Sequence, residues 1–365
     1  MSEPATPPEI VRPPVVHLGP LGWLRANLFG SWFDALLTLV ILWGLAELVP
    51  PLVRWAVTNA VFTAADSRLC KAADGACWAF IHEKYRLILF GTYPYDQQWR
   101  PLLVVMIVVA LFALSCDRRT WSRWLVPLWL GAGLLVMALM GGGVLGLAPV
   151  ENRLWGGLPL TLMLAVAGLA VAFPAAVLLA LGRRSELPVV RLLCAGYIEL
   201  IRGVPLVSLL FMAAVMLPLL LPPGLTVDKL LRAQIAFILF AAAYLAEVVR
   251  GGLQSIPQGQ SEAADALGLT YWQKMATVIL PQALAAAIPP IVNTFIAFFK
   301  DTSLVIIIGL FDLLSTAKSA IADPAWHGFY RESYLFIALI YWAFCFFMSR
   351  YSLWLEHNLN RGHRT

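Results

Sequence analysis

Long apolar runs separated by short polar segments dominate the chain. A helix needs about 20 mostly apolar residues to cross the hydrocarbon core of a bilayer, so such runs predict membrane-spanning helices. Eight runs meet this expectation: 33–57, 101–116, 124–147, 158–182, 190–218, 231–251, 284–310 and 333–355. The pattern predicts an all-α integral membrane protein with about eight transmembrane helices.

Prolines interrupt several of these runs. Pro174 lies in the fourth run, Pro205 and Pro218 lie in the fifth, and Pro289 and Pro290 lie in the seventh. Broken helices at membrane depth are tolerated mainly where they face protein or a water-filled path. Because the fifth and seventh runs are also long, we expect tilted or kinked spans there.

The composition agrees with a membrane protein. Hydrophobic residues make up 60% of the chain and charged residues 13%, which is typical of a protein in a bilayer. The formal net charge of +5 does not indicate nucleic acid, because the basic residues form short groups between apolar runs. Many of the 14 Trp lie near the ends of runs, as in an aromatic belt.

The basic residues predict an orientation. If the N-terminus is cytoplasmic, the loops on the cytoplasmic side carry most of the positive charge, as the positive-inside rule requires. The basic residues of those loops are Arg118, Arg119, Arg123, Arg183, Arg184, Arg191, Arg250, Lys274, Arg350, Arg361 and Arg364. The outside segment 58–100 is also basic, but long loops report topology poorly. Both termini are therefore predicted to be cytoplasmic.

The N-terminal residues 1–32 begin with a polar, proline-rich stretch that lacks the regions of a signal peptide. We expect a disordered cytoplasmic tail there.

Two cysteines lie in the outside segment. Cys70 and Cys77 can form a disulfide in an oxidising compartment, or they can be two unpaired thiols packed under a loop. Their spacing does not match a zinc site and no histidine cluster supports one. We therefore expect no metal.

Segment 260–282 is less apolar than its surroundings and has the pattern of a helical hairpin. Ser261 can cap a helix whose first turn contains Glu262, and Gly268 permits the left-handed turn that ends it. A second amphipathic helix is expected over about 270–280, before Pro281. Small alanines and an apolar Leu267 suit a helix that docks into a groove of another protein.

The same residues carry a resemblance to a known family. Glu262-Ala263-Ala264, followed by Gly268 and then Leu280-Pro281, resembles the EAA loop of ABC importer permeases, which contacts the ATPase subunit. Val278 stands where the family prefers Ile. Flanking sequence over 197–210, 244–260, 280–293 and 299–310 is similar to the polar-amino-acid permeases, and the match covers about 155–355.

The N-terminal part extends this resemblance. GACWAFI and FGTYPYDQQWRP resemble the long M-type permease of general L-amino-acid importers, whose relatives serve glutamate, glutamine, aspartate and asparagine. The resemblance implies a type I core of five helices over 155–355, with a cytoplasmic coupling loop at 252–283. An extension of three spans occupies 33–154, and 356–365 form a cytoplasmic tail.

The resemblance also implies partners. A five-helix core supplies half of a pore, so a second and different permease is expected, in a bacterial inner membrane. A dimeric ABC ATPase would bind ATP and Mg, and a periplasmic protein would deliver the L-amino acid. This chain is expected to bind no cofactor, since it lacks the GxxxxGK[ST] phosphate loop, and no catalytic triad supports an enzyme. The outside segment 58–100 either takes part in docking or caps the extension.

The residues assigned to ATPase coupling are Glu262, Ala263, Ala264, Leu267, Gly268, Leu280 and Pro281. The alternative for this segment is an interfacial amphipathic helix, but that expects a broad basic face. For the whole chain, the alternatives are an ion-gradient-driven transporter, which commonly shows internal repeats, and a membrane enzyme or scaffold.

Ionisable groups inside spans are candidates for a solute path, because charges in the hydrocarbon core are costly. Glu199 and Arg202 are spaced i,i+3 in the fifth run and face one side of a helix. They either form a structural ion pair, or Arg202 holds a substrate carboxylate beside the break at Pro205. Asp301, Thr302 and Ser303 are the candidates near an ammonium or polar group.

Overall fold

The computed structural model describes residues 19–64, 66–144, 146–222 and 224–360. The described residues fall into two compact units, divided between Ala76 and Cys77. The first 18 residues of the expected N-terminal tail lie outside the described residues.

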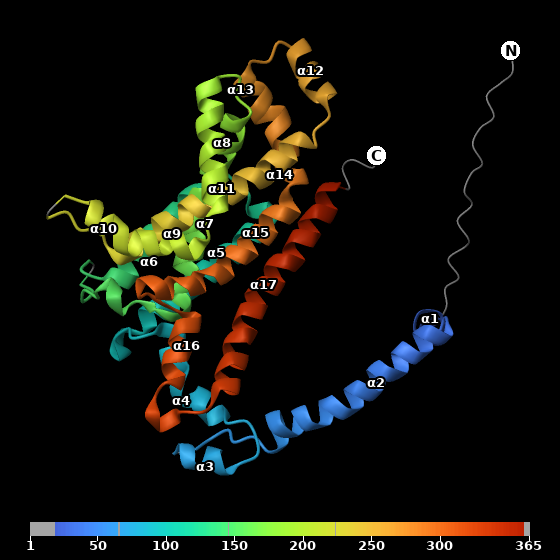
Figure 1. The fold of residues 1–365 in the computed structure, drawn as a ribbon, viewed down its shortest axis with the longest axis vertical. Coiled ribbons are helices and arrows are strands. Elements are labelled where there is room, and N and C mark those ends of the chain that lie inside the picture. Colours follow the sequence, from blue (N-terminus) through green and yellow to red (C-terminus); the bar gives the residue numbers. More distant parts are fainter. Residues whose placement is uncertain (1–18, 65, 145, 223, 361–365) are drawn as a thin grey trace. The chain divides into compact units, whose positions relative to one another are not determined.

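The first unit contains one long helix. α1 (Pro20–Leu28) occupies part of the expected tail, and α2 (Trp32–Val53) continues through a π-helical turn to Thr58 (Figure 1). Ser31 caps α2 by accepting from the Asp34 amide at 3.1 Å. Every residue of α2 is at least partly exposed, as a helix surrounded by lipid requires. A short helix, α3 (Ser67–Ala72), completes this unit.

The second unit is a helical bundle (Figure 1). Its helices are α4 (Trp78–Phe90), α5 (Trp99–Cys116), α6 (Leu125–Gly141), α7 (Gly157–Arg183), α8 (Pro188–Gly203), α9 (Leu206–Phe211), α10 (Leu217–Leu220), α11 (Lys229–Gln254), α12 (Gln258–Ala266), α13 (Tyr271–Lys274), α14 (Leu280–Ala286), α15 (Ile288–Asp301), α16 (Leu313–Ile321) and α17 (Tyr330–Asn360), with a short strand, β1 (Phe311–Asp312). Short 3₁₀ or π-helical turns occupy Tyr95–Gln97, Arg118–Thr120, Asn152–Leu154, Met212–Met216, Met275–Ile279, Thr302–Ile308 and Pro324–Trp326.

Small residues let α7 and α11 pack closely at the centre of the bundle. Gly168, Ala172, Ala176 and Ala180 recur every fourth residue of α7, and all four are buried. A Cβ on Gly168 would approach the side-chain nitrogen of Gln234 on α11 to 2.9 Å. Membrane helices associate through such rows of small residues because close backbone approach replaces the hydrophobic driving force of water.

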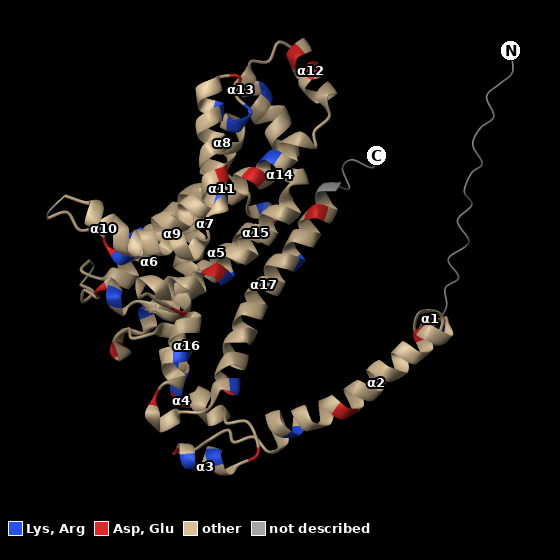
Figure 2. Cartoon of the chain, in the orientation of Figure 1, with Lys and Arg blue, Asp and Glu red and all other residues tan. Residues whose placement is uncertain are grey.

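The all-α membrane fold is confirmed. Among the described residues, six helices are long and apolar enough to cross a bilayer, and the bent pair of α8 with α9–α10 makes a seventh if it is one broken span. α6 is a shorter apolar helix of 17 residues. Along α17, charged positions lie mainly towards the two ends (Figure 2). Each of the eight predicted runs thus coincides with helix in the described residues, although the seventh run covers the end of α14, a break at Ala287, and then α15 and a 3₁₀ helix.

The fifth run is not one continuous span. α8 and α9–α10 meet at an angle of 99°, with Val204 and Pro205 between them. A residue before proline is pushed out of the helical region, and Val204 has ψ 131°. The expected kink is therefore confirmed, and it is large.

α4 lies across one end of the bundle, away from the α12–α13 hairpin (Figure 1). The Thr316 hydroxyl on α16 donates to the Ile88 carbonyl at 2.7 Å, and Glu332 on α17 accepts from the Cys77 amide at 2.9 Å. Gly91, at φ +63°, passes close to Gly156, where any Cβ would clash with backbone. This part of segment 58–100 therefore caps core helices, rather than the extension alone.

Candidate functional site

α12 is the first arm of a helical hairpin between the spans α11 and α14–α15. It begins at Gln258, with Pro257 as the N-cap residue and no side-chain cap. The predicted cap at Ser261 is therefore wrong, since Ser261 lies within the helix and is half-buried. Pro257 fixes the start one turn earlier, because its ring sets φ and its own missing N–H costs nothing at a helix start.

Gly268 ends this arm as predicted. Its φ is +71°, and the Leu269 amide reaches back to the Ala264 carbonyl at 3.2 Å. This bond closes a Schellman-type turn, which favours glycine because a side chain at positive φ is strained.

The return arm is short and is tied to the first. Thr270 and Gln273 form a reciprocal capping box at the start of α13, and a π-helical turn then leads into α14. Lys274 Nζ lies 2.7 Å from Asp265 Oδ1 on α12, and the side-chain amide of Gln282 donates to Gln260 Oε1 at 3.1 Å. Side chains thus link the two arms at two levels.

The tip of the hairpin presents apolar surface that the described chain leaves uncovered. Leu267 is 79% exposed and Trp272 is 67% exposed, and Tyr271 packs edge-to-face on Trp272 with ring centroids 5.3 Å apart. Sequence reasoning missed this aromatic pair, although it follows the glycine turn directly. An exposed apolar tip on a braced hairpin suits docking into another protein's groove.

The other coupling residues divide between the two faces of the hairpin. Glu262, Ala263, Gly268 and Pro281 are exposed, whereas Leu280 is half-buried. Ala264 is only 2% exposed and packs inward. The exposed group can meet a partner, and Ala264 holds α12 against its own chain.

A charge network lies where α7, α8 and α11 converge. Glu247 of α11 accepts from Arg250 Nε at 3.0 Å, from Arg183 Nη1 at 3.4 Å, and faces Arg202 Nη1 at 3.8 Å. Arg183 also pairs with Glu199 at 2.8 Å. Glu247 and Arg250 pair within α11 at i,i+3 spacing, but Glu199 and Arg202 pair with other helices rather than with each other.

The remaining candidates for a solute path do not join this network. Thr302 is fully buried and donates to the Phe299 carbonyl at 2.8 Å, while Asp301 and Ser303 are half-buried. Within the described residues, no hydrogen bond or ion pair joins Arg202 to any of these three. Their role as a substrate site therefore stays a prediction.

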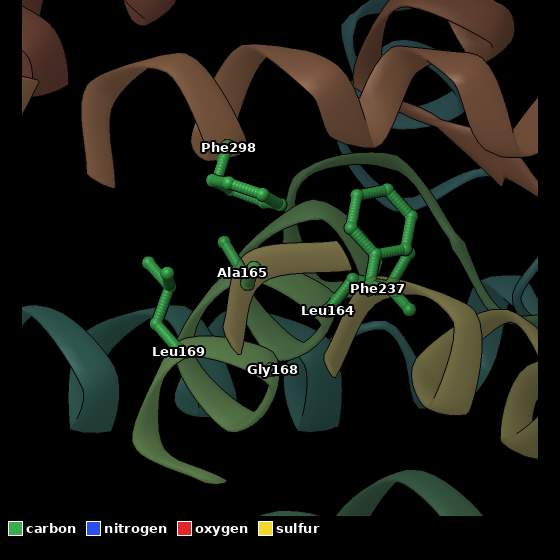
Figure 3. Close-up of a pocket in the computed structure, with 7 residues that line it drawn as sticks. Leu164, Ala165, Gly168, Leu169, Phe237 and Phe298 are labelled. Carbon is green, nitrogen blue, oxygen red and sulfur yellow. The ribbon is translucent and has the colours of Figure 1, made fainter. Parts of the chain in front are cut away.

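One small crevice lies between α7, α11 and α15 (Figure 3). Its lining is entirely apolar and leaves no volume open to a water molecule: Leu164, Ala165, Gly168, Leu169, Phe237, Ala241 and Phe298. It contains none of the predicted path residues. An apolar, dry crevice of this kind does not suit a charged amino acid.

A buried polar cluster joins β1 to the surrounding helices, and sequence reasoning missed it. Asp312 is fully buried and caps α16 by accepting from the Leu314 and Ser315 amides at 3.0 Å each. The Tyr341 hydroxyl of α17 also donates to it at 3.2 Å, and Thr161 of α7 accepts from the Leu313 amide at 3.0 Å. The segment FDLLS carried the signal, an aspartate before a helical run.

Three cysteines of the described chain, Cys116, Cys194 and Cys345, are free thiols. The Cys70–Cys77 disulfide stays a prediction. Among the described residues, no group of three or more His, Cys, Asp or Glu could hold a metal ion.

Comparison with known proteins identifies the family in which these features occur. Residues 172–361 match the family described as binding-protein-dependent transport system inner membrane components. The chain belongs to this family. The matched region contains the hairpin, the charge network and all the predicted path residues. The members of this family are multi-pass permease subunits of the inner membrane.

The permease resembles its relatives over nearly all of its length. It is 51% identical to the inner membrane amino-acid ABC transporter permease protein YhdY of Escherichia coli, over 93% of each chain. It is 39% identical to the glutamate/glutamine/aspartate/asparagine transport system permease protein BztC of Rhodobacter capsulatus, over 96% of each chain. A crystal structure of an amino acid ABC transporter with histidines covers 55% of this permease at 31% identity, with a TM-score of 0.50.

Proposed function

We propose that this permease is the membrane subunit of an ATP-driven importer for L-amino acids, among them acidic amino acids and their amides. The relatives named above support the substrate class, since they are amino-acid permeases. The observation that carries the proposal is the braced hairpin, which leaves Leu267 and Trp272 exposed between two spans. A membrane-embedded path alone has no need of such a projection.

The hairpin would transmit force from a separate ATPase dimer, which binds ATP and Mg. Its return arm runs without a break through a π-helical turn into α14, and only the three residues 255–257 separate its first arm from α11. Glu247 joins α11 by charge to α7 and α8, so a displacement of the hairpin would carry these helices together. The chemistry belongs to the ATPase, and this subunit converts its stroke into helix movement.

The complete importer would contain a second, different permease and a periplasmic amino-acid-binding protein. Both termini of this chain would be cytoplasmic, as its arginine distribution indicates. Within the path, Arg202 would receive the substrate carboxylate, and Asp301, Thr302 and Ser303 would face the remainder of the amino acid. No observation favours the alternative of an ion-gradient-driven transporter.

Glu262→Lys tests the coupling role. Glu262 is exposed on α12, so reversing its charge should disturb the docking surface and leave the spans folded. In proteoliposomes with the partner subunits, we expect ATP-driven uptake to fall at least about tenfold, the equivalent of losing about 1.4 kcal/mol of coupling, while thermal unfolding of the permease stays unchanged.

Glu186→Lys is the matched control, because Glu186 is an exposed glutamate in the turn between α7 and α8. It should transport like the unmodified protein. Normal uptake by the Glu262 variant would contradict the proposal.

A further inference from the structure

The turn between α5 and α6 forms a crevice that the proposed transport role does not use. It has a cavity volume of about 480 Å³, within the usual size of ligand pockets. Its lining is mainly apolar: Leu114, Thr120, Ser122, Trp124, Leu125, Pro127 and Leu128. An open, apolar crevice at the end of a membrane hairpin suits an acyl chain rather than a soluble metabolite.

The crevice has a fixed shape because hydrogen bonds secure the turn. The Thr120 hydroxyl donates to the Asp117 carbonyl at 2.7 Å, and the Trp121 indole donates to the Ser115 carbonyl at 2.8 Å. The Trp129 indole donates to the Ser115 hydroxyl at 3.0 Å. These bonds hold the turn against α5 and α6 without any ligand.

The rim of the crevice is positively charged. In the sequence, the turn 117–124 contains three arginines (118, 119 and 123) and one aspartate (117), a net charge of +2. The Arg123 guanidinium lies 5.6 Å from the ring centre of Trp124, which lines the crevice. Arg119 and Arg123 are exposed, and neither has an ion-pair partner among the described residues.

The turn lies at the same end of the bundle as the coupling hairpin. At the other end, the Tyr93 hydroxyl donates to the Met140 carbonyl at 3.0 Å, and Arg100 donates to the Ala148 carbonyl at 2.8 Å. These contacts place the start of α5 beside the end of α6, and Gly157 at the start of α7 approaches Leu89 there. The 117–124 turn therefore lies towards the end of α7, where Arg183 contacts Glu247 of α11.

We propose that this crevice binds one anionic phospholipid, with an acyl chain against Leu125 and Leu128 and the phosphodiester at Arg119 and Arg123. Exposed tryptophans at 121 and 124 would lie at the headgroup level, where such rings are enriched. Arginines next to a membrane helix, at the anionic cytoplasmic leaflet, are each attracted to the lipid surface by about 1 kcal/mol. The lipid would tie the short α5–α6 hairpin to the inner leaflet.

Native mass spectrometry of the intact permease complex tests this proposal. Dioleoyl phosphatidylglycerol should be retained in preference to phosphatidylcholine with the same chains. Removing both charges with Arg119→Gln and Arg123→Gln should weaken retention about fivefold for each arginine, which corresponds to about 1 kcal/mol each. A photoreactive phosphatidylglycerol should label peptides within 114–128.

Arg153→Gln provides the matched control. Arg153 is an exposed arginine at the opposite end of the bundle, paired with Glu151, and its removal should not change lipid retention. Glycerophosphoglycerol, which lacks acyl chains, should not bind. Any one of four results would overturn the proposal. These are equal retention of the two lipids, unchanged retention in the double variant, binding of the chainless headgroup, and crosslinking of residues 114–128 to a protein instead of the lipid.

Discussion

At the scale of single residues, Glu247 accounts for much of the organisation near the hairpin. One carboxylate faces three guanidinium groups, from Arg183, Arg202 and Arg250, and its side chain is 22% exposed. Exposed ion pairs contribute little, but networks of partly buried charges contribute more. This network gives α7, α8 and α11 a common attachment point beside the proposed path.

A second ion pair, between Lys84 and Asp323, fastens α4 to the far end of the bundle and gives a pH-dependent prediction. Lys84 Nζ lies 2.6 Å from Asp323 Oδ2. The hydrogen bond that Lys84 donates, and to a lesser extent the one from the Ala325 amide, lowers the pKa of Asp323 below its usual value. Because the pKa of Asp323 is lower in the folded state, the ion pair stabilises the protein fully at pH values above the pKa of an unfolded-state aspartate, about 3.9. This contribution is lost as pH falls through the folded-state value.

Asp323→Asn should therefore lower the melting temperature at pH 7, and the difference from the unmodified protein should shrink as pH falls below 4. Glu151→Gln, which removes an exposed pair with Arg153, should have little effect at either pH. A constant deficit for the Asp323 variant between pH 7 and pH 3 would rule out the ion pair as its cause.

Residue-level prediction from the sequence identified charged groups but not their partners. The i,i+3 spacing of Glu199 and Arg202 places both on one face of α8, yet spacing cannot show that Arg183 and Glu247 compete for them from neighbouring helices. The same limit applies to Asp312, whose burial depends on Tyr341 and Thr161 from distant parts of the chain.

At the scale of elements, the hairpin depends on one backbone conformation. Gly268 has φ +71°, and nothing lies within 4 Å of a Cβ added there. Gly268→Ala therefore introduces backbone strain of about 1–2 kcal/mol without a steric clash. Amides over 264–270 should exchange hydrogen at least about fivefold faster, because each 1.4 kcal/mol corresponds to a factor of ten.

Gly259→Ala is the matched substitution on the same hairpin. Gly259 lies in α12 and also has open space around its Cβ position, but alanine favours a helix by about 0.5–1 kcal/mol. Exchange there should be slowed or unchanged. If both alanine variants exchanged alike, the left-handed turn would not be what shapes the hairpin.

The sequence predicted the end of α12 better than its beginning. Gly268 is a strong local signal because few residues adopt positive φ, whereas several residues before Glu262 could start a helix. The structure selects Pro257 over Ser261, and that choice depends on how the chain leaves α11. Thr270 and Gln273 supplied a capping pattern for the return arm, and it was overlooked.

At the scale of the whole molecule, the length of the apolar runs was sufficient to predict the spans. The runs that became α11 and α17 are long and contain no proline, and the run that became α7 stays helical through Pro174; length alone predicts a membrane helix. The sequence could not predict the 99° bend between α8 and α9. Pro205 indicates where the helix breaks, but the angle between the two parts depends on how they pack. Nor could the sequence indicate that α4 would cap α16 and α17.

The proposed coupling requires the hairpin tip to contact an ATPase on the cytoplasmic side. A photocrosslinker attached at Leu267→Cys, in the assembled importer, measures this contact directly. Leu225→Cys is the control, since Leu225 is an exposed leucine in the loop that precedes α11. We predict a crosslink from position 267 to the ATPase subunit and none from position 225. A crosslink from 267 to the periplasmic binding protein, or to no ATPase, would contradict the account.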